Sequence, residues 1–228
     1  MNAKELLYKY KSLIIIILLF LVVFTVRAEA ANIGGVPDEA KSFYQDPSGI
    51  PYFSEMDSYY HLRLTSDLMD HGYLGDKFNG SQWDLHSSYP PGKSANYPPL
   101  IGYLAEIGYI ITNLFVKVPL VAVCFWMGAF IASLAVIPAY FLVKKITNIY
   151  GGIVAGLLVG LAPAYVGHTH AGFFDTDMFG MIIPLFIVLF FVISLSADNF
   201  RKRAIYASLA AFAMLLFALA WQGWWYIY

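Results

Sequence analysis

Charged residues are scarce in this sequence, and cysteine occurs once. Asp, Glu, Lys and Arg make up 13% of the 228 residues, whereas 59% are hydrophobic and 18% are aromatic. That balance excludes an ordinary soluble domain, in which about a quarter of the residues are charged. The single cysteine, Cys124, excludes an internal disulfide; it lies in an apolar run and is expected to face lipid or to pack. The composition therefore predicts an integral membrane protein.

The N-terminal region contains an apolar stretch, Leu13 to Val26, which follows a lysine-rich start. Such a stretch fits either a signal peptide or a first membrane helix, and residues 28–30 (Ala-Glu-Ala) offer a weak cleavage site. We interpret the stretch as an uncleaved signal anchor, because a multispanning chain needs no cleavage. Arg27 would then form an interfacial stop at the end of the helix.

Further apolar runs follow the long central part of the chain. Four of them carry no charge and are long enough to cross a bilayer, which takes roughly 20 residues. They are Val118 to Val143, Ile146 to Gly167, Met178 to Ala197, and Ala204 to the end. Another run, Leu100 to Val116, is ambiguous, because it follows two prolines, carries Glu106 and Asn113, and is only marginally long.

The distribution of basic residues resolves this ambiguity. Lys144–Lys145 and Arg201–Arg203 lie in two short connections, where the preference of positive charge for the cytoplasm is strongest. Both groups are cytoplasmic only if Leu100 to Val116 lies along the interface. Eight of the fourteen Lys and Arg are then inside, and thirteen of the fifteen acids are outside, all but Glu5 and Asp198. The net charge of −1 averages over the two sides and gives no argument for acidic partners, and no nucleic acid partner is predicted.

These segments predict an all-α membrane protein with about five transmembrane helices. Its regions are a cytoplasmic N-terminus with the first helix (1–27), a long first external loop (28–117), and a transmembrane bundle (118–228) that carries a second external loop near 168–177. The long loop is rich in Tyr, Trp and paired Pro, which suits short interfacial helices and fixed turns. It also contains a glycosylation sequon, Asn79-Gly80-Ser81, which is weak support for an external position. Trp221, Trp224 and Trp225 are expected to form an interfacial belt.

Three aspartates stand out at the predicted external face. Asp57 lies in the long loop, whereas Asp175 and Asp177 are two residues apart in the short one. Carboxylates next to long apolar segments are costly to keep there, so a functional role with a divalent cation is the default interpretation. Three carboxylates with some water would suit Mg²⁺ or Mn²⁺. Asp175 could instead cap the following membrane helix.

Histidines near these aspartates are further candidates. His168 and His170 could be ligands, phosphate contacts or plain interfacial side chains, and His61 would share a helix face with Asp57 because it stands four residues later. Arg63 is expected to pair with one of the acids of the long loop, or to snorkel.

Two segments resemble a known enzyme family. Met56–Arg63 (Met-Asp-Ser-Tyr-Tyr-His-Leu-Arg) and Ala171–Met178 (Ala-Gly-Phe-Phe-Asp-Thr-Asp-Met) resemble the first and second acidic motifs of the catalytic subunit of oligosaccharyltransferase, the enzyme of asparagine-linked glycosylation. In that family the first motif lies in a long first external loop and the second at the outer end of the third membrane helix. The resemblance covers essentially the whole chain, as the N-terminal part of the family's catalytic subunit.

The resemblance implies roles for individual residues. Asp57 and Asp175 match metal ligands for Mg²⁺ or Mn²⁺, and Asp57 would also contact the acceptor amide. Asp177 falls where some members have Asp and others His, and is the third metal ligand that we expect. His168 occupies a position where a basic side chain is expected near the donor phosphates; because it is His, its charge would depend on pH.

The family's later parts are missing from this sequence. A carboxylate from a later external loop and a Trp-Trp-Asp motif are both absent, and the chain ends at Tyr228 inside or at the edge of an apolar element. We therefore expect an N-terminal fragment that is inactive alone.

The implied reaction is transfer of an oligosaccharide from a polyprenyl (dolichyl-type) phosphate or pyrophosphate to Asn in Asn-x-Ser/Thr. The expected place is the external face of a prokaryotic plasma membrane. The alternatives are another transferase that uses lipid-linked sugars, such as a protein O-mannosyltransferase, or a cation-binding subunit or transporter. A transporter is expected to bind its ion near the bilayer midplane, whereas these acids lie at segment ends.

Overall fold

The structure is a computed structural model that describes residues 3–228, with side chains from residue 10 onward. Four segments are long and apolar enough to cross a membrane: Tyr10–Asn32, Leu120–Ile146, Thr176–Leu195 and Phe200–Ala220. The first is α1 (Ala3–Ala28) with the short 3-10 helix η1 (Glu29–Asn32), and the second is α4 (Leu120–Ser133) followed by α5 (Val136–Ile146). The third is η3 (Thr176–Met178) with α8 (Phe179–Leu195), and the last is α9 (Phe200–Ala220). The all-α membrane class is thereby confirmed.

The segment predicted from Ile146 to Gly167 is broken into two shorter helices. These are α6 (Ile149–Gly160) and α7 (Pro163–Gly167). Pro163 lacks an N–H and disfavours a helical conformation for the residue before it, so the chain leaves the helix at Leu161 and Ala162. Neither helix reaches the length of a full span, which is why four long helices are found where about five were predicted.

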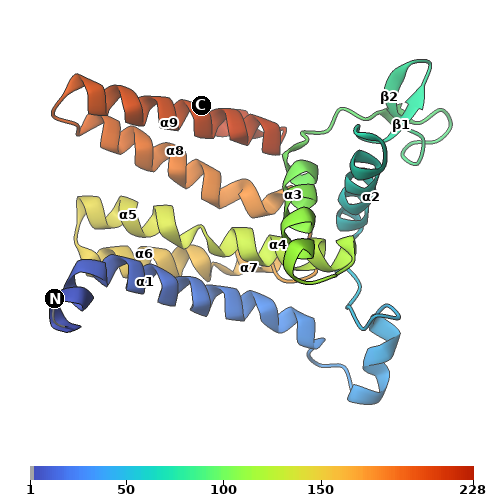
Figure 1. Ribbon diagram of the computed structural model, residues 1–228, viewed down its shortest axis with the longest axis horizontal. Helices are drawn as coiled ribbons and strands as arrows, with labels where there is room; N and C mark the ends of the chain where they lie inside the picture. Colours follow the sequence, from blue (N-terminus) through green and yellow to red (C-terminus); the bar gives the residue numbers. More distant parts are fainter. Residues whose placement is uncertain (1–2) are drawn as a thin grey trace.

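Two groups of helices build the bundle. α1, α5 and α6 lie together in one group, and the α8–α9 hairpin forms the other (Figure 1). Glycines on α6 let this helix approach α1 closely. A Cβ on Gly156 would meet Leu19 at 3.0 Å, and one on Gly160 would meet Val23 at 2.4 Å. Small residues of this kind let membrane helices approach closely.

The main core is built by α4, the segment around residue 174 and the α8–α9 hairpin, whereas α1 and α5 share a second, smaller cluster. Phe125 of α4, Phe174, Met178 and Phe217 of α9 are all at most 2% exposed and belong to one cluster of buried side chains. Cys124 is buried in the same cluster, so it packs and does not face lipid. The segment around residue 174 is thus held in place by side chains of the helix bundle.

The long region between α1 and α4 is folded, as its composition predicted. It contains the 3-10 helix η2 (Asp38–Tyr44), α2 (Met56–His71), a small sheet and α3 (Leu100–Phe115). α3 stands across the ends of the bundle helices (Figure 1). It is shorter than a membrane span, and large apolar side chains such as Ile107, Ile111 and Phe115 are exposed on it. This placement agrees with the prediction that the segment lies along the interface.

The sheet was not predicted. Strands β1 (Asp76–Phe78), β2 (Ser81–Asp84) and β3 (Lys93–Ser94) form an antiparallel sheet in the order β1-β2-β3. Asn79 and Gly80 join the first two strands, both with positive φ (48° and 80°). An Asn-Gly pair with this backbone is the strongest short signal of a β-hairpin. We interpreted this segment only as a sequon, and the missed turn explains why strands were not expected.

Charges separate to the two ends of the bundle. The last turn of α5, which carries Lys144–Lys145, and the first turn of α9, which carries Arg201–Arg203, lie at one end, whereas α2, α3 and the segment after α7 lie at the other (Figure 1). The C-terminal tryptophans follow α9, and Trp221 and Trp225 are exposed by 37% and 69%. Trp224 is only partly exposed and packs against the main core, so the interfacial belt of three tryptophans stays a prediction.

Candidate functional site

The first acidic motif begins with a helix cap. Glu55 has an extended backbone, and its carboxylate accepts the backbone N–H groups of Asp57 and Ser58, both at 2.6 Å. A carboxylate at this position satisfies free N–H groups and suits the positive end of the helix dipole. Asp57 therefore lies in the first turn of α2, where it is exposed and has no hydrogen bond or ion pair from its side chain to any described residue.

The second acidic motif is a tight turn that leads into α8. Gly172 has φ of +89°, and a Cβ there would meet the ring of Phe125 at 2.9 Å, so only glycine fits. Asp175 caps η3 by accepting the backbone N–H of Thr176 at 2.5 Å. The capping role that the sequence left open for Asp175 is therefore present.

The two motifs are in direct contact. The backbone N–H of Ser54 donates to the carbonyl of Gly172 at 2.9 Å, and that of Phe174 donates to the hydroxyl of Ser58 at 2.8 Å. The third contact joins His61 Nε2 and Asp175 Oδ1 at 3.0 Å. Ser58 and His61 are three residues apart on α2, and Ser54 lies just before the helix; together they meet residues 172, 174 and 175 of the other motif.

The environment of Asp175 favours its charged form. Its side chain is 18% exposed, and this burial by itself raises the pKa of the carboxyl group. Hydrogen bonds from His61 and Thr176 outweigh burial, so the pKa of Asp175 is lower than that of an ordinary aspartate. The His61 ring is only 3% exposed, which makes this pair an interior contact with one edge at the surface.

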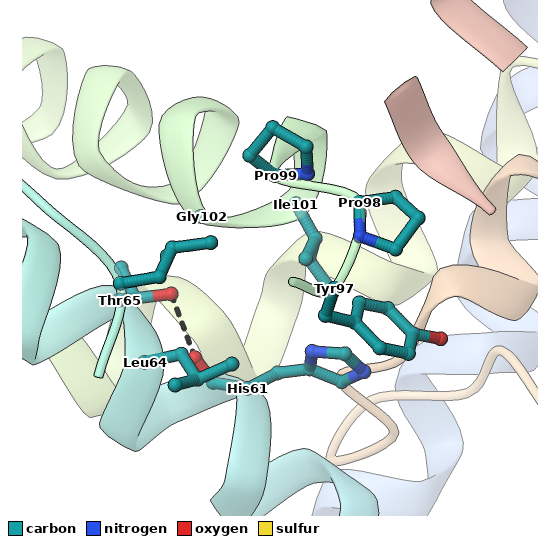
Figure 2. A pocket seen from close by; sticks show the side chains of 9 residues that line it. His61, Leu64, Thr65, Tyr97, Pro98, Pro99, Ile101 and Gly102 are labelled. Atoms are coloured by element: carbon teal, nitrogen blue, oxygen red, sulfur yellow. Dashed lines mark hydrogen bonds between the residues drawn. The ribbon is translucent and has the colours of Figure 1, made fainter. Parts of the chain in front are cut away.

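A cavity borders the other side of the His61 ring. It has a volume of about 10 Å³, room for about one water molecule, and its lining includes Thr65, Tyr97 and Ile101. Figure 2 shows His61 below Tyr97, with Pro98 and Pro99 above them. Nδ1 of His61 is buried and has no partner among the described residues. The hydroxyl of Tyr97 also lies 3.4 Å from that of Thr176, so the end of the long loop covers the contact between the motifs.

Asp177 and His168 form a separate, exposed pair. His168 Nδ1 lies 3.1 Å from Asp177 Oδ2, and the two side chains are 63% and 45% exposed. His168 was predicted to contact donor phosphates; in the structure it lies beside the second motif, within reach of solvent, and its described partner is a carboxylate. Its position is compatible with the predicted role, which stays a prediction.

The three aspartates do not form a closed metal site in this arrangement. Among the described side chains, no group of three or more His, Cys, Asp and Glu residues could hold a metal ion. Asp175 and Asp177 each direct one oxygen to a histidine, and Asp57 lies on the neighbouring motif. The donor type still fits, because carboxylate oxygens suit Mg²⁺ and Mn²⁺. The carboxylates of the predicted metal centre therefore lie on two motifs that touch, but they do not point toward one common position.

Arg27 is fully buried at the end of α1, which was not predicted. Its place as an interfacial stop stays a prediction. Nε donates to the hydroxyl of Thr169 at 3.0 Å and Nη1 to the carbonyl of Gly160 at 2.6 Å, while its own carbonyl accepts the N–H of Ala171 at 3.0 Å. Two of the three guanidinium nitrogens thus have partners, whereas the buried Nη2 has none among the described residues. Arg27 thus ties α1 to the segment that carries Asp175.

Arg63 pairs with acids of the long loop, as expected. Nη2 lies 2.8 Å from Asp84 of β2 and Nη1 lies 3.3 Å from Asp67. The Tyr60 ring lies 5.6 Å from the Arg63 guanidinium and 5.2 Å from the ammonium of Lys93. The sheet is thereby attached to α2 beside Asp57. The contacts of Glu55, Ser58 and Arg27 were not predicted.

Fold and site together describe a multispanning membrane protein with two acidic motifs in contact at one end of its bundle. Residues 13–228 match the family model described as oligosaccharyl transferase STT3, N-terminal. The chain belongs to this oligosaccharyltransferase family, which confirms the resemblance.

Named relatives are similar over nearly the whole chain. A dolichyl-phosphooligosaccharide-protein glycotransferase of Methanococcus voltae is 31% identical over 96% of this chain, and one of Methanocaldococcus jannaschii is 32% identical over 92%. This chain spans about a quarter of their length, 25% and 23%. A crystal structure of the Archaeoglobus fulgidus oligosaccharyltransferase, tethered with an acceptor peptide containing an NVT sequon, aligns with a TM-score of 0.75 at 17% identity. That alignment covers 98% of this chain and 26% of the other, and supports the fold.

Proposed function

We propose that this chain supplies part of an active site that transfers an oligosaccharide from a polyprenyl phosphate or pyrophosphate to Asn in Asn-x-Ser/Thr. The observation that carries the proposal is the contact between the two acidic motifs through His61 and Asp175. Family membership supports it, because the relatives are named as glycotransferases of dolichyl-linked oligosaccharides. One solved Archaeoglobus fulgidus neighbour contains an inhibitory peptide and a dolichol-phosphate. The O-mannosyltransferase and transporter alternatives have no comparable support.

Asp57 is the group proposed to meet the acceptor. An amide nitrogen is a poor nucleophile because its lone pair is delocalised into the carbonyl. A carboxylate that accepts hydrogen bonds from the amide N–H groups weakens that delocalisation and stabilises the charge that develops in the transition state. Asp57 suits this role because its side chain is exposed and has no hydrogen bond to any described residue. The Glu55 cap fixes the first turn of α2, where Asp57 lies.

We propose a divalent cation, Mg²⁺ or Mn²⁺, held by Asp57, Asp175 and Asp177. Such an ion neutralises the charge that grows on the leaving phosphate. Asp175 is suited to it because the bond from His61 keeps the carboxylate ionised and leaves its second oxygen available. His168 is proposed to lie near the donor phosphate, since it is exposed at the same edge.

We further propose that the two motifs face the outside of a prokaryotic plasma membrane. The support is the charge asymmetry: Lys144–Lys145 and Arg201–Arg203 lie at the end of the bundle opposite to the motifs. We also expect this chain to be inactive by itself, because the Trp-Trp-Asp motif and the later carboxylate of the family are absent from its 228 residues.

The test is a transfer assay with the protein that the gene containing this chain encodes. Membranes are given a lipid-linked oligosaccharide and a fluorescent Asn-x-Thr peptide, and glycopeptide formation is measured. Asp57→Ala is expected to lower the rate by about a hundredfold or more without lowering the melting temperature, because the side chain is exposed. The matched control is Asp70→Ala, an exposed aspartate near the other end of the same helix. Near wild-type transfer by the Asp57 variant would overturn the proposal.

A further inference from the structure

A wedge-shaped groove opens at the end of the bundle opposite to the acidic motifs. It has a volume of about 590 Å³ and lies between α5 and the α8–α9 hairpin. The two groups of helices diverge toward the turns that carry Lys144 and Arg201–Arg203 (Figure 1). This is the size of a typical ligand site.

The walls of the groove are apolar, and its mouth is basic. Phe141 of α5 faces Phe186 and Phe190 of α8, and the lysines of the last turn of α5, Lys144 and Lys145, also line the groove. Lys144 donates a hydrogen bond from Nζ to the hydroxyl of Ser12 of α1 at 2.7 Å. Lys145 is exposed and has no hydrogen bond or ion pair to any side chain from residue 10 onward.

More positive charge lies on the facing hairpin. Arg201, Lys202 and Arg203 begin α9, one turn before Tyr206, which also lines the groove. All three are exposed, and the turns at residues 144–148 and 196–203 together contain one acid, Asp198. The mouth of the groove therefore carries a local excess of positive charge from both of its sides.

We propose that this groove binds an anionic phospholipid, with its acyl chains between the aromatic side chains and its phosphate beside Lys145. Basic pockets between membrane helices bind such head groups, and each Lys or Arg near them contributes a few-fold in affinity. A helix of another protein or a neutral lipid would cover the aromatic walls but would leave Lys145 without a counter-charge. The larger groove between α1, α3 and α4, which has a volume of about 610 Å³, is lined by apolar residues and Thr112 without a cation, so nothing there selects an occupant.

The test places the protein that the gene containing this chain encodes in nanodiscs that contain phosphatidylglycerol with a photoactivatable acyl chain, and a parallel sample contains the matching phosphatidylcholine. After irradiation, adducts are located by mass spectrometry of peptides. The expected result is several-fold more adduct with phosphatidylglycerol on the peptides that contain Phe141 and Phe190.

Two variants and one control make the result specific. Lys145→Glu is expected to lower the phosphatidylglycerol adduct by about fivefold or more, and Ile193→Trp, which fills the groove, should remove adducts of both lipids. Lys11→Glu changes an exposed lysine of α1 that does not line the groove and should have no effect. Equal labelling by the two lipids, equal loss in the Lys11 variant, or absence of groove adducts would each overturn the proposal. None of these results depends on glycan transfer.

Discussion

His61 of α2 and Asp175, 114 residues further along the chain, lie 3.0 Å apart between Nε2 and Oδ1. The histidine is almost fully buried, so it can hold the carboxylate at a defined place while one edge of the aspartate stays accessible. A carboxylate ligand that is itself hydrogen-bonded is a common device of metal sites. In this protein the same bond also joins the two acidic motifs.

Replacing His61 tests this joint role. His61→Leu should lower transfer by about 10- to 100-fold, as loss of a group that orients a ligand does. It should also destabilise the chain by about 1–3 kcal/mol, because Asp175 loses its partner. His61→Gln keeps an N–H donor near the position of Nε2 and should retain much of the transfer activity and much of the stability. Glycopeptide formation and thermal unfolding measure the two effects; equal activity of the Leu and Gln variants would contradict the role of the hydrogen bond.

Metal removal addresses the proposed cation. Treatment of the intact enzyme with EDTA should abolish transfer, and added Mn²⁺ or Mg²⁺ should restore it. Asp177→Asn should raise the Mn²⁺ concentration for half-maximal activity by about tenfold or more, since it removes the charge of one proposed ligand. Asp70→Asn should leave that concentration unchanged. Full activity in EDTA would remove the support for a metal-dependent site.

Arg27 should contribute to stability and to activity. Arg27→Met removes the donors to Thr169 and to the carbonyl of Gly160, two charged hydrogen bonds in the interior. We expect a loss of about 1–3 kcal/mol in the free energy of unfolding, together with slower transfer, because the segment that carries Asp175 loses the side-chain bond to Thr169 and keeps the backbone bond from Ala171 to the Arg27 carbonyl. Lys117→Met, at an exposed position between α3 and α4, is the control. Unchanged unfolding in the Arg27 variant would show that these bonds are energetically neutral.

Two glycines near the second motif offer a matched comparison. Gly172→Ala places a methyl group against Phe125 at a backbone φ of +89°, which costs about 1–2 kcal/mol for the conformation alone. Gly167→Ala, five residues earlier, meets no atom within 4 Å. The melting temperature should fall in the first variant and stay the same or rise slightly in the second. A similar decrease in both would show that the packing at Gly172 is not responsible.

The sheet beside Asp57 should loosen in acid. Asp84 is buried, which by itself raises the pKa of its carboxyl group, but hydrogen bonds from Ser87, the His86 backbone and Arg63 lower the pKa below that of an ordinary aspartate. A lowered pKa stabilises the folded sheet above the unfolded value, about 3.9, and this contribution is lost as pH falls through the folded value.

Hydrogen exchange can follow this loosening in the segment 76–94. After correction for intrinsic rates, its exchange should accelerate as the pH is lowered below about 4. Asp84→Asn should show fast exchange with little pH dependence. A wild-type profile as flat as that of the variant would mean that the ion pair with Arg63 does not hold the sheet.

Patterns in sequence predicted the class and four of the membrane helices, because hydropathy acts directly on membrane segments. The interfacial position of α3 stays a prediction. These patterns did not predict that Arg27 is buried or that His61 bonds to Asp175. Both facts depend on which segments meet across more than a hundred residues, and local patterns of hydropathy and charge do not specify such contacts. The sheet is a different case, since its Asn79–Gly80 turn was visible and was interpreted only as a sequon.

The spacing of Ser54, Ser58 and His61 limits how the long loop can vary in length. Each residue of an α-helix advances about 100° around its axis, so one residue inserted between Ser58 and His61 would turn the imidazole away from Asp175. An insertion in the turn at Asn79–Gly80, in contrast, extends an exposed loop tip. The region between α1 and α4 can therefore grow at its hairpin while the start of α2 keeps a fixed residue count.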